Sequence, residues 1–204
     1  MTGYLFPIII AIDDVLPAIE GRPEFVVADR GDHTIINYNV MMSDTFPPVM
    51  AAGEYDLHAA IRRECRGIIF AKSDGKIIRR PLHKFMNVNE KEETLIENLD
   101  FDLPHSIYHK LDGSMIAPYI IEGRFIWGTK MAAESFHDDI SEWARDKPNY
   151  EEFSRTLIHS GYTPIFEWTG PENRIVIGYK ETKLTLLAIR EMNTGEYQPL
   201  KNAS

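Results

Sequence analysis

Short runs of β-branched and aromatic residues, each bounded by turn residues, constrain this fold more than any other feature of the sequence. Residues 66–81 hold two such runs around Ser73-Asp74-Gly75, and residues 114–130 hold two around Glu122-Gly123, so both stretches are predicted hairpins. Further runs typical of strands cover residues 24–28, 34–40, 163–170, 173–179 and 183–191. Because most of these runs are sequential, the pattern predicts mainly antiparallel sheet.

Helical patterns are fewer than strand patterns. Residues 89–99 are a helix candidate with a charged face, and residues 134–146 and 150–161 form a helical stretch. That stretch is broken at Lys147-Pro148 and stopped by Gly161. The predicted fold class is therefore α+β, with mainly antiparallel sheets and flanking helices.

The composition is that of one sizeable globular domain, since 44% of the 204 residues are hydrophobic. The formal net charge of -9 argues against a protein that coats nucleic acid non-specifically, so a phosphate site would need a local basic cluster. A single cysteine, Cys65, cannot form an internal disulfide and fits a reducing compartment. The apolar start, residues 4–12, is too short to span a bilayer. These features predict a cytosolic protein without a membrane anchor.

One stretch of the chain does concentrate positive charge. Residues 62–84 contain eight lysines and arginines: Arg62, Arg63, Arg66, Lys72, Lys76, Arg79, Arg80 and Lys84. They would either bind phosphates or form the solvated face of a hairpin, because alternate strand residues point to opposite sides. For Lys72, Lys76, Arg79 and Arg80 the sequence leaves both interpretations open.

The motif Lys-x-Asp-Gly at residues 110–113 carries the strongest chemical signal. A lysine is a nucleophile only after losing a proton, and its ordinary pKa of about 10.4 makes that rare in water. Burial or neighbouring cations ready such an amine for attack. We expect Lys110 at the end of a strand, where His109 would point to the opposite face and Gly113 lets the backbone approach a ligand. Alone, the motif also fits a surface lysine before an ordinary Asp-Gly turn.

The motif does not stand alone. The blocks ECRGIIF, RPLHKFMNVNE, KLDGS, GTK, FEWTGPENRIVIGY and LTLLAIREMNTGEY follow one another between Tyr38 and Tyr197. Together they resemble the T-even phage RNA ligase 1 family, a branch of the covalent nucleotidyltransferases. The resemblance implies an ATP-grasp-like nucleotidyltransferase fold and an ATP-dependent RNA ligase, which joins a 3′-hydroxyl to a 5′-phosphate through lysyl-AMP. It also implies Mg²⁺ as cofactor, RNA ends as substrates with nicked tRNA among them, and the host cytoplasm as location if a phage encodes the chain.

The resemblance assigns roles to residues position by position. Lys110 matches the nucleophile, and Glu167 matches the acid that contacts the ribose or holds a metal-bound water. The remaining ATP- and phosphate-binding positions are Tyr38, Arg66, Lys84, Leu111 (through its backbone), Asp112, Gly113 and Lys130. Three alternatives stay open: Tyr38 as a packing residue, Glu167 as a half-exposed strand residue, and Asn173 with Arg174 as a turn cap rather than a phosphate site.

The family pattern also contains a fourth motif, an acid followed by glycine, and a fifth, a Lys-x-Lys pair. Neither is found up to Ser204. The resemblance therefore predicts that residues 1–204 are the N-terminal part of an adenylyltransferase domain, without those motifs and without a tRNA-binding domain. The chain would then be a ligase, or a non-catalytic nucleotide- or RNA-binding module that needs a second chain. GTP-dependent capping chemistry shares the lysine motif but not the flanking blocks.

Overall fold

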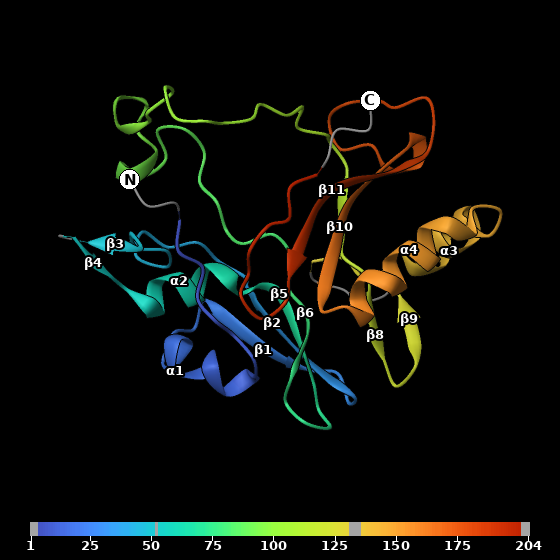
Figure 1. Cartoon of the computed structure of the whole chain (residues 1–204), viewed down its shortest axis with the longest axis horizontal. Coiled ribbons are helices and arrows are strands. Elements are labelled where there is room, and N and C mark those ends of the chain that lie inside the picture. Colours follow the sequence, from blue (N-terminus) through green and yellow to red (C-terminus); the bar gives the residue numbers. More distant parts are fainter. Residues whose placement is uncertain (1–3, 52, 131–135, 201–204) are drawn as a thin grey trace.

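The computed structural model describes residues 4–51, 53–130 and 136–200 of the chain. Two groups of strands lie side by side in it (Figure 1). The first sheet has the order β1-β2-β5-β6, with bounds Phe25–Asp29, His33–Tyr38, Arg66–Ala71 and Ile77–Arg79. The second has the order β11-β10-β7, with bounds Lys183–Glu191, Tyr162–Thr169 and Ser114–Ile116. Two small hairpins complete the strands: β3 (Met50–Ala51) with β4 (Glu54–Tyr55), and β8 (Tyr119–Ile121) with β9 (Arg124–Ile126).

Every strand pair in the described residues is antiparallel, and this confirms the predicted α+β class. The α-helices are α1 (Leu16–Ile19), α2 (Leu57–Glu64), α3 (His137–Ala144) and α4 (Pro148–His159). The 3₁₀ turns are η1 (Ile12–Asp14), η2 (Glu92–Thr94), η3 (Ile96–Asn98) and η4 (Pro171–Asn173). Among the described residues, none of these helices is long and apolar enough to cross a membrane.

The first sheet is covered on both faces. Ile36 and Ile68 pack with α1 and α2 on one face, while Ile35 and Ile69 pack with the β8–β9 hairpin on the other. This explains why β2 and β5 are buried along nearly their whole length instead of alternating with solvent. The second sheet buries Phe166, among others, against α3 and α4.

Three predicted elements were wrong. Residues 89–99 form two 3₁₀ turns instead of a helix, because Asn89 has a left-handed φ of 64° and its side chain accepts a hydrogen bond from the Ile96 N–H. Residues 173–179 are not a strand, because the Val176 and Ile177 N–H groups donate to the Asp112 carboxylate rather than to a neighbouring strand. The strand that was expected to end at Lys110 does not form, since residues 99–113 are irregular and β7 begins only at Ser114.

Two further features of the fold were not predicted. In residues 114–130 only β8 and β9 form the hairpin, at the predicted turn, whereas β7 pairs with β10. Helix α2 was missed, although Asp56 supplies an N-cap whose carboxylate accepts a hydrogen bond from the Ala59 N–H. Helices α3 and α4 do lie within the predicted helical stretch and meet at Lys147-Pro148.

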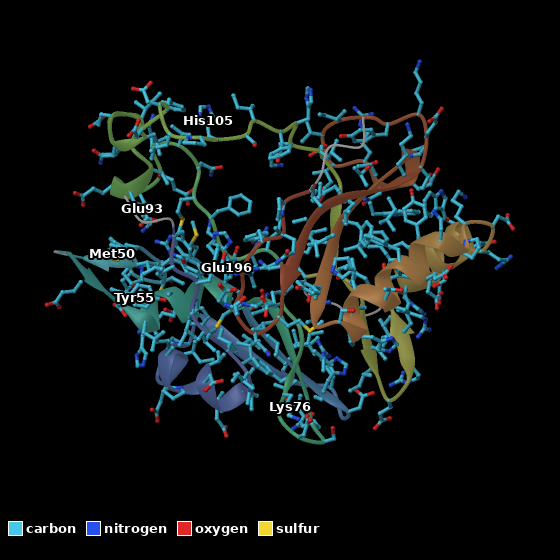
Figure 2. All side chains as sticks on the ribbon, in the orientation of Figure 1. Met50, Tyr55, Lys76, Glu93, His105 and Glu196 are labelled. Atoms are coloured by element: carbon cyan, nitrogen blue, oxygen red, sulfur yellow. The ribbon has the colours of Figure 1, made fainter. Side chains whose placement is uncertain are left out.

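The basic stretch is divided between solvent and the interior. Arg79 and Arg80 are 0% exposed, so neither open interpretation of these two residues holds: they are buried structural arginines. Arg79 donates to the Gly67 carbonyl, and Arg80 pairs with the buried Glu64. Lys76, in contrast, lies at the tip of the β5–β6 hairpin and is solvated (Figure 2).

A long connection leads from the first sheet to the second. Residues 80–113 contain no strand; they rise from the first sheet and then cross the top of the molecule in green and yellow-green (Figure 1). This path brings the Lys-x-Asp-Gly segment down beside β10 just before β7 begins.

Candidate active site

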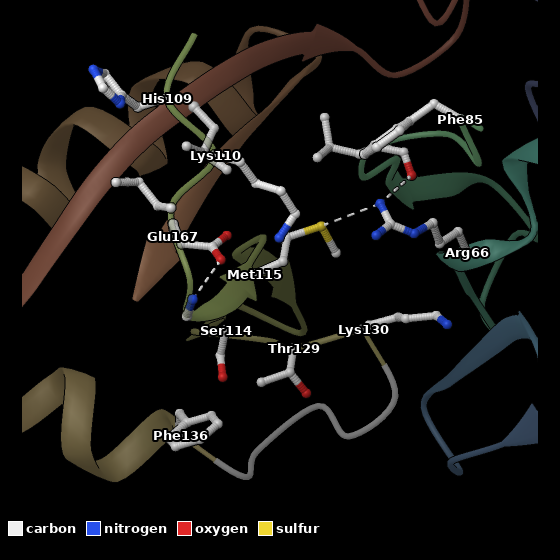
Figure 3. A pocket seen from close by; sticks show the side chains of 14 residues that line it. Arg66, Phe85, His109, Lys110, Ser114, Met115, Thr129, Lys130, Phe136 and Glu167 are labelled. Atoms are coloured by element: carbon white, nitrogen blue, oxygen red, sulfur yellow. Dashed lines mark hydrogen bonds between the residues drawn. The ribbon is translucent and has the colours of Figure 1, made fainter. Parts of the chain in front are cut away.

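A cavity of about 490 Å³ lies where the Lys-x-Asp-Gly segment meets both sheets (Figure 3). Its lining includes six of the residues that the sequence singled out: Arg66, Lys110, Leu111, Gly113, Lys130 and Glu167. Tyr38, Lys84 and Asp112 do not line it. The cavity therefore collects residues from β5, β10 and two connections that are far apart in the sequence.

Lys110 reaches the cavity from an irregular segment. The expected strand end is wrong, and the side chain is exposed, not buried. Figure 3 shows its amine pointing into the cavity toward Met115. Two other cations, Arg66 and Lys130, line the same space. Three cations, Lys110, Arg66 and Lys130, therefore surround this cavity.

Glu167 enters the cavity from β10. Its neighbours Phe166 and Trp168 are buried in the core of the second sheet, as the alternation of a strand predicts. Its Oε1 accepts a hydrogen bond of 3.0 Å from the Gly113 N–H (Figure 3). Burial raises the pKa of this carboxyl above its ordinary value, although the Gly113 N–H and the charges of Lys110 and Arg66 act in the opposite direction.

Asp112 and Gly113 fix the backbone beside Lys110. The Asp112 carboxylate accepts hydrogen bonds of 2.6 Å from both the Val176 and the Ile177 N–H. The N–H groups of Ile177 and Val176 hold the pKa of Asp112 below its ordinary value. A Cβ on Gly113 would overlap the Trp168 carbonyl oxygen, so only glycine allows this close approach.

Two of the predicted phosphate-binding cations, Arg66 and Lys84, differ in placement. The Arg66 guanidinium lines the cavity, 5.4 Å from the Phe85 ring centroid and 3.5 Å from the Leu82 carbonyl oxygen. The Lys84 amine donates to the Phe85 carbonyl at 3.0 Å and lies 3.7 Å from the Glu90 carboxylate. In this conformation Lys84 is directed toward its own segment rather than into the cavity.

Lys130 and Tyr38 form a pair at the edge of the site. The Lys130 amine lies 3.8 Å from the centroid of the Tyr38 ring, which also packs at 5.1 Å from the Phe46 ring. In this structure Tyr38 therefore packs against Phe46 and Lys130, and packing is one of the two roles that the sequence left open for it.

Some lining residues were missed by sequence reasoning. Leu82, Phe85, Met115 and Leu187 line the cavity, and nothing in their local pattern distinguishes them from ordinary apolar packing residues. His109 also lines it, because the strand that would have turned it to the opposite face does not form. Only the contact between the two sheets identifies these residues.

Comparison with known proteins identifies the family of this chain. Residues 64–204 match the family model described as RNA ligase. The chain belongs to the T-even phage RNA ligase 1 family. This membership agrees with the motif blocks from which the resemblance was first inferred.

Individual relatives within this family cover most of the chain. A protein of Thermovibrio ammonificans that is assigned by name to the RNA ligases is 33% identical over 189 residues, 92% of this chain and 47% of its own length. RNA ligase 1 of bacteriophage TS2126 is 28% identical over 66% of this chain and 36% of its own. An RNA ligase of Rhodothermus phage RM378 is 26% identical, over 63% and 37%. The chain therefore spans less than half the length of these relatives.

A solved structure of an archaeal ATP-dependent RNA ligase also aligns with this chain. The alignment has a TM-score of 0.46 and 15% sequence identity, and it covers 90% of this chain and 44% of the archaeal protein.

The carboxylates of this RNA ligase family member limit how a metal ion binds. Within residues 4–51, 53–130 and 136–200, no three His, Cys, Asp or Glu residues are grouped in a way that could hold a metal. The Asp112 carboxylate is engaged by backbone N–H groups, and Glu167 contributes the one carboxylate of the cavity's described lining. Such a donor set fits Mg²⁺ that arrives with phosphate oxygens and waters, and it does not fit a metal held by protein ligands alone.

Proposed function

We propose that this chain carries the adenylyltransferase part of an ATP-dependent RNA ligase, with Lys110 as the nucleophile. One observation supports this most: Lys110 lines a single cavity together with two cations, Arg66 and Lys130, and one carboxylate, Glu167. A volume of about 490 Å³ lies within the range of pockets that bind small molecules. Family membership supplies the reaction class.

In the proposed first step, the neutral Lys110 amine attacks the α-phosphorus of ATP. A P–N bond forms as the P–O bond to pyrophosphate breaks, and the amine proton passes to solvent. Arg66 and Lys130 would neutralise charge on the phosphates, which is a large source of rate enhancement in sites of this kind. Glu167 would contact the ribose or hold a water of a phosphate-bound Mg²⁺, and that ion would neutralise phosphate oxygens.

The later steps act on RNA. The AMP would pass from Lys110 to the 5′-phosphate of an RNA end, and a 3′-hydroxyl would then displace AMP to close the strand. Nicked tRNA in the cytoplasm is the proposed setting. These steps are proposed for the whole ligase of which this chain spans a part.

The first test is covalent labelling. The chain is incubated with Mg²⁺ and ATP labelled at the α-phosphate, with pyrophosphatase present to draw the reaction forward. We expect one AMP on Lys110 by peptide mapping and none in Lys110→Ala. Lys72→Ala, a solvated hairpin lysine, is the matched control and should label like the wild type. AMP on a different lysine would overturn the assignment, and equal labelling by GTP would favour capping chemistry.

A second candidate function is a nucleotide- or RNA-binding module that reacts only with another chain. The observation in its favour is that the chain spans 47%, 36% and 37% of the length of its relatives. The Lys-x-Lys pair and the acid of the fourth motif would then come from elsewhere. Each such group is worth about 100–1,000-fold in rate, so ATP binding should far exceed AMP formation.

This candidate is tested by adding a fragment that carries the fourth and fifth motifs of the family. ATP binding is measured by calorimetry, and AMP formation is measured with and without a fragment of a relative that carries both motifs. The module predicts binding without reaction, and reaction after addition. RNA joining at a robust rate by the chain alone would exclude the module and support the complete enzyme.

A further inference from the structure

The segment that carries Lys110 has no secondary structure of its own. Neither a helix nor a strand covers residues 99–113, and the ladder of the second sheet begins only at Ser114. The Lys110 side chain is exposed, and among the described residues the Lys110 backbone makes no hydrogen bond to either sheet. Something else must therefore fix this segment against β10.

The connection between β10 and β11 supplies that support. Its residues 170–182 reach across to Asp112 three times: the Val176 and Ile177 N–H groups bond to the carboxylate at 2.6 Å each, and the Tyr179 hydroxyl oxygen accepts from the Asp112 N–H at 3.0 Å. Asp112 is thereby held through both its side chain and its backbone.

Two side chains of the connection hold the motif on either side of Gly113. Tyr179, which is half-buried, bonds to Asp112, and Asn173 accepts a hydrogen bond of 3.1 Å from the Ser114 hydroxyl. Asn173 is itself fixed, because its amide nitrogen donates to the Trp168 carbonyl at 2.7 Å. The Gly113 N–H also donates to Glu167, so each residue from 112 to 114 is hydrogen-bonded to β10 or to the connection that follows it.

We propose that Tyr179 is a positioning residue for Lys110. Its hydroxyl anchors the backbone two residues after the lysine and so keeps the exposed amine in the cavity. The inference rests on the proposed function, because it concerns the attack of Lys110 on a nucleotide. A displacement of about 1 Å at a reacting group can cost about 100-fold in rate. Loss of one anchoring hydrogen bond can therefore lower the rate more than it lowers the stability of the fold.

The variant Tyr179→Phe removes the hydroxyl and keeps the ring. Tyr162→Phe is the matched control, since Tyr162 is also half-buried but its hydroxyl makes no hydrogen bond among the described residues. Hydrogen exchange of residues 111–114, measured by mass spectrometry, reports the anchor without any reaction. We expect exchange about five-fold faster in Tyr179→Phe, the effect of one ordinary hydrogen bond, with exchange in the core strands unchanged.

Two reactivity measurements separate positioning from mere structure. Competitive acetylation by acetic anhydride should modify Lys110 several-fold faster relative to Lys130 in Tyr179→Phe, because the released amine leaves the cavity more often. The rate of AMP formation at saturating ATP should fall, while the ATP concentration for half-saturation stays the same. Tyr162→Phe should change none of these quantities.

The outcomes distinguish failure of the positioning role from failure of the proposed function. Unchanged exchange, or faster exchange with an unchanged Lys110-to-Lys130 acetylation ratio, would overturn the positioning role. AMP absent from Lys110 in the wild type would overturn the proposed function instead, and exchange with acetylation would still decide whether Tyr179 orients Lys110.

Discussion

Glu167 experiences opposing influences on its charge. Burial on β10 disfavours the carboxylate, while the Gly113 N–H, Lys110 and Arg66 favour it, and burial prevails, so the pKa is raised. A raised pKa in the folded state means that this residue stabilises the fold when protonated. That contribution is fully present below the ordinary pKa of 4.5 and is lost as the pH rises through the folded value.

Replacing Glu167 by glutamine tests this charge directly. Glutamine resembles the protonated acid and does not titrate, so Glu167→Gln should match the wild type near pH 4.5 and exceed it in thermal midpoint by a few degrees at pH 7. Melting curves at a series of pH values measure the difference. A difference that stays constant or shrinks as the pH rises would contradict the assigned cause.

Gly113 is the second residue whose identity the site requires. In Gly113→Ala the new methyl group would overlap the Trp168 carbonyl oxygen and lie 2.8 Å from Thr169 Cγ2. The segment must then move away from β10, and AMP formation at Lys110 should fall by about 100-fold. Gly123→Ala is the control: it meets no atom within 4 Å and only strains a turn with φ of 76°, so its labelling should persist. Equal labelling of both variants would refute the requirement.

At the scale of elements, α2 links the core of the first sheet to the cavity. The helix begins after the Asp56 cap, buries Ala60 and Ile61, and ends at the buried Glu64. Two residues later β5 begins with Arg66, which lines the cavity. The start of this short helix thus influences both a buried ion pair and a cation of the site.

Two variants of Asp56 test the N-cap of α2. Asp56→Ala removes the acceptor of the Ala59 N–H and should lower the free energy of unfolding by about 1 kcal/mol, whereas Asp56→Asn keeps an acceptor and should cost little. Urea denaturation of the two variants measures this. Equal losses would show that the carboxylate charge, not the cap bond, is what stabilises the helix.

At the scale of the whole molecule, one buried triad joins the two sheets. Glu64 at the end of α2 bonds to Arg190 on β11 at 2.7 Å and to Arg80, just after β6, at 3.1 Å, and all three side chains are 0% exposed. Burial alone would raise the Glu64 pKa, but Arg190 and Arg80 outweigh burial and hold it at about 2.

Breaking the triad should loosen the whole fold. Glu64→Gln leaves two buried guanidinium groups without a charge partner, which typically costs about 3–5 kcal/mol. Because the folded pKa is lowered, the wild-type contribution is present above pH 4.5 and is lost as the pH falls toward about 2. Chemical denaturation at several pH values measures both effects, with the exposed Glu97→Gln as control. A loss similar to that of the control would mean that the triad does not hold the sheets together.

The sequence by itself determined the features that depend on near neighbours. Runs of β-branched and aromatic residues between turn residues placed β1, β2, β5, β10 and β11 within a few residues, and the Glu122-Gly123 turn set the β8–β9 hairpin. Pro148 and Gly161 marked the ends of a helix. The motif blocks likewise identified the lysine and the family, because a motif is a local arrangement of side chains.

Only the tertiary structure decided which distant groups meet. Arg80 and Arg190 are buried because Glu64 lies beside them, and Glu64 and Arg190 are 126 positions apart in the chain. Residues 173–179 have a strand's composition, yet the N–H groups of Val176 and Ile177 find the Asp112 carboxylate instead of a neighbouring strand. A charged or N–H group pairs with a group that the fold brings within about 3 Å. The residues adjacent in sequence do not specify which group that is.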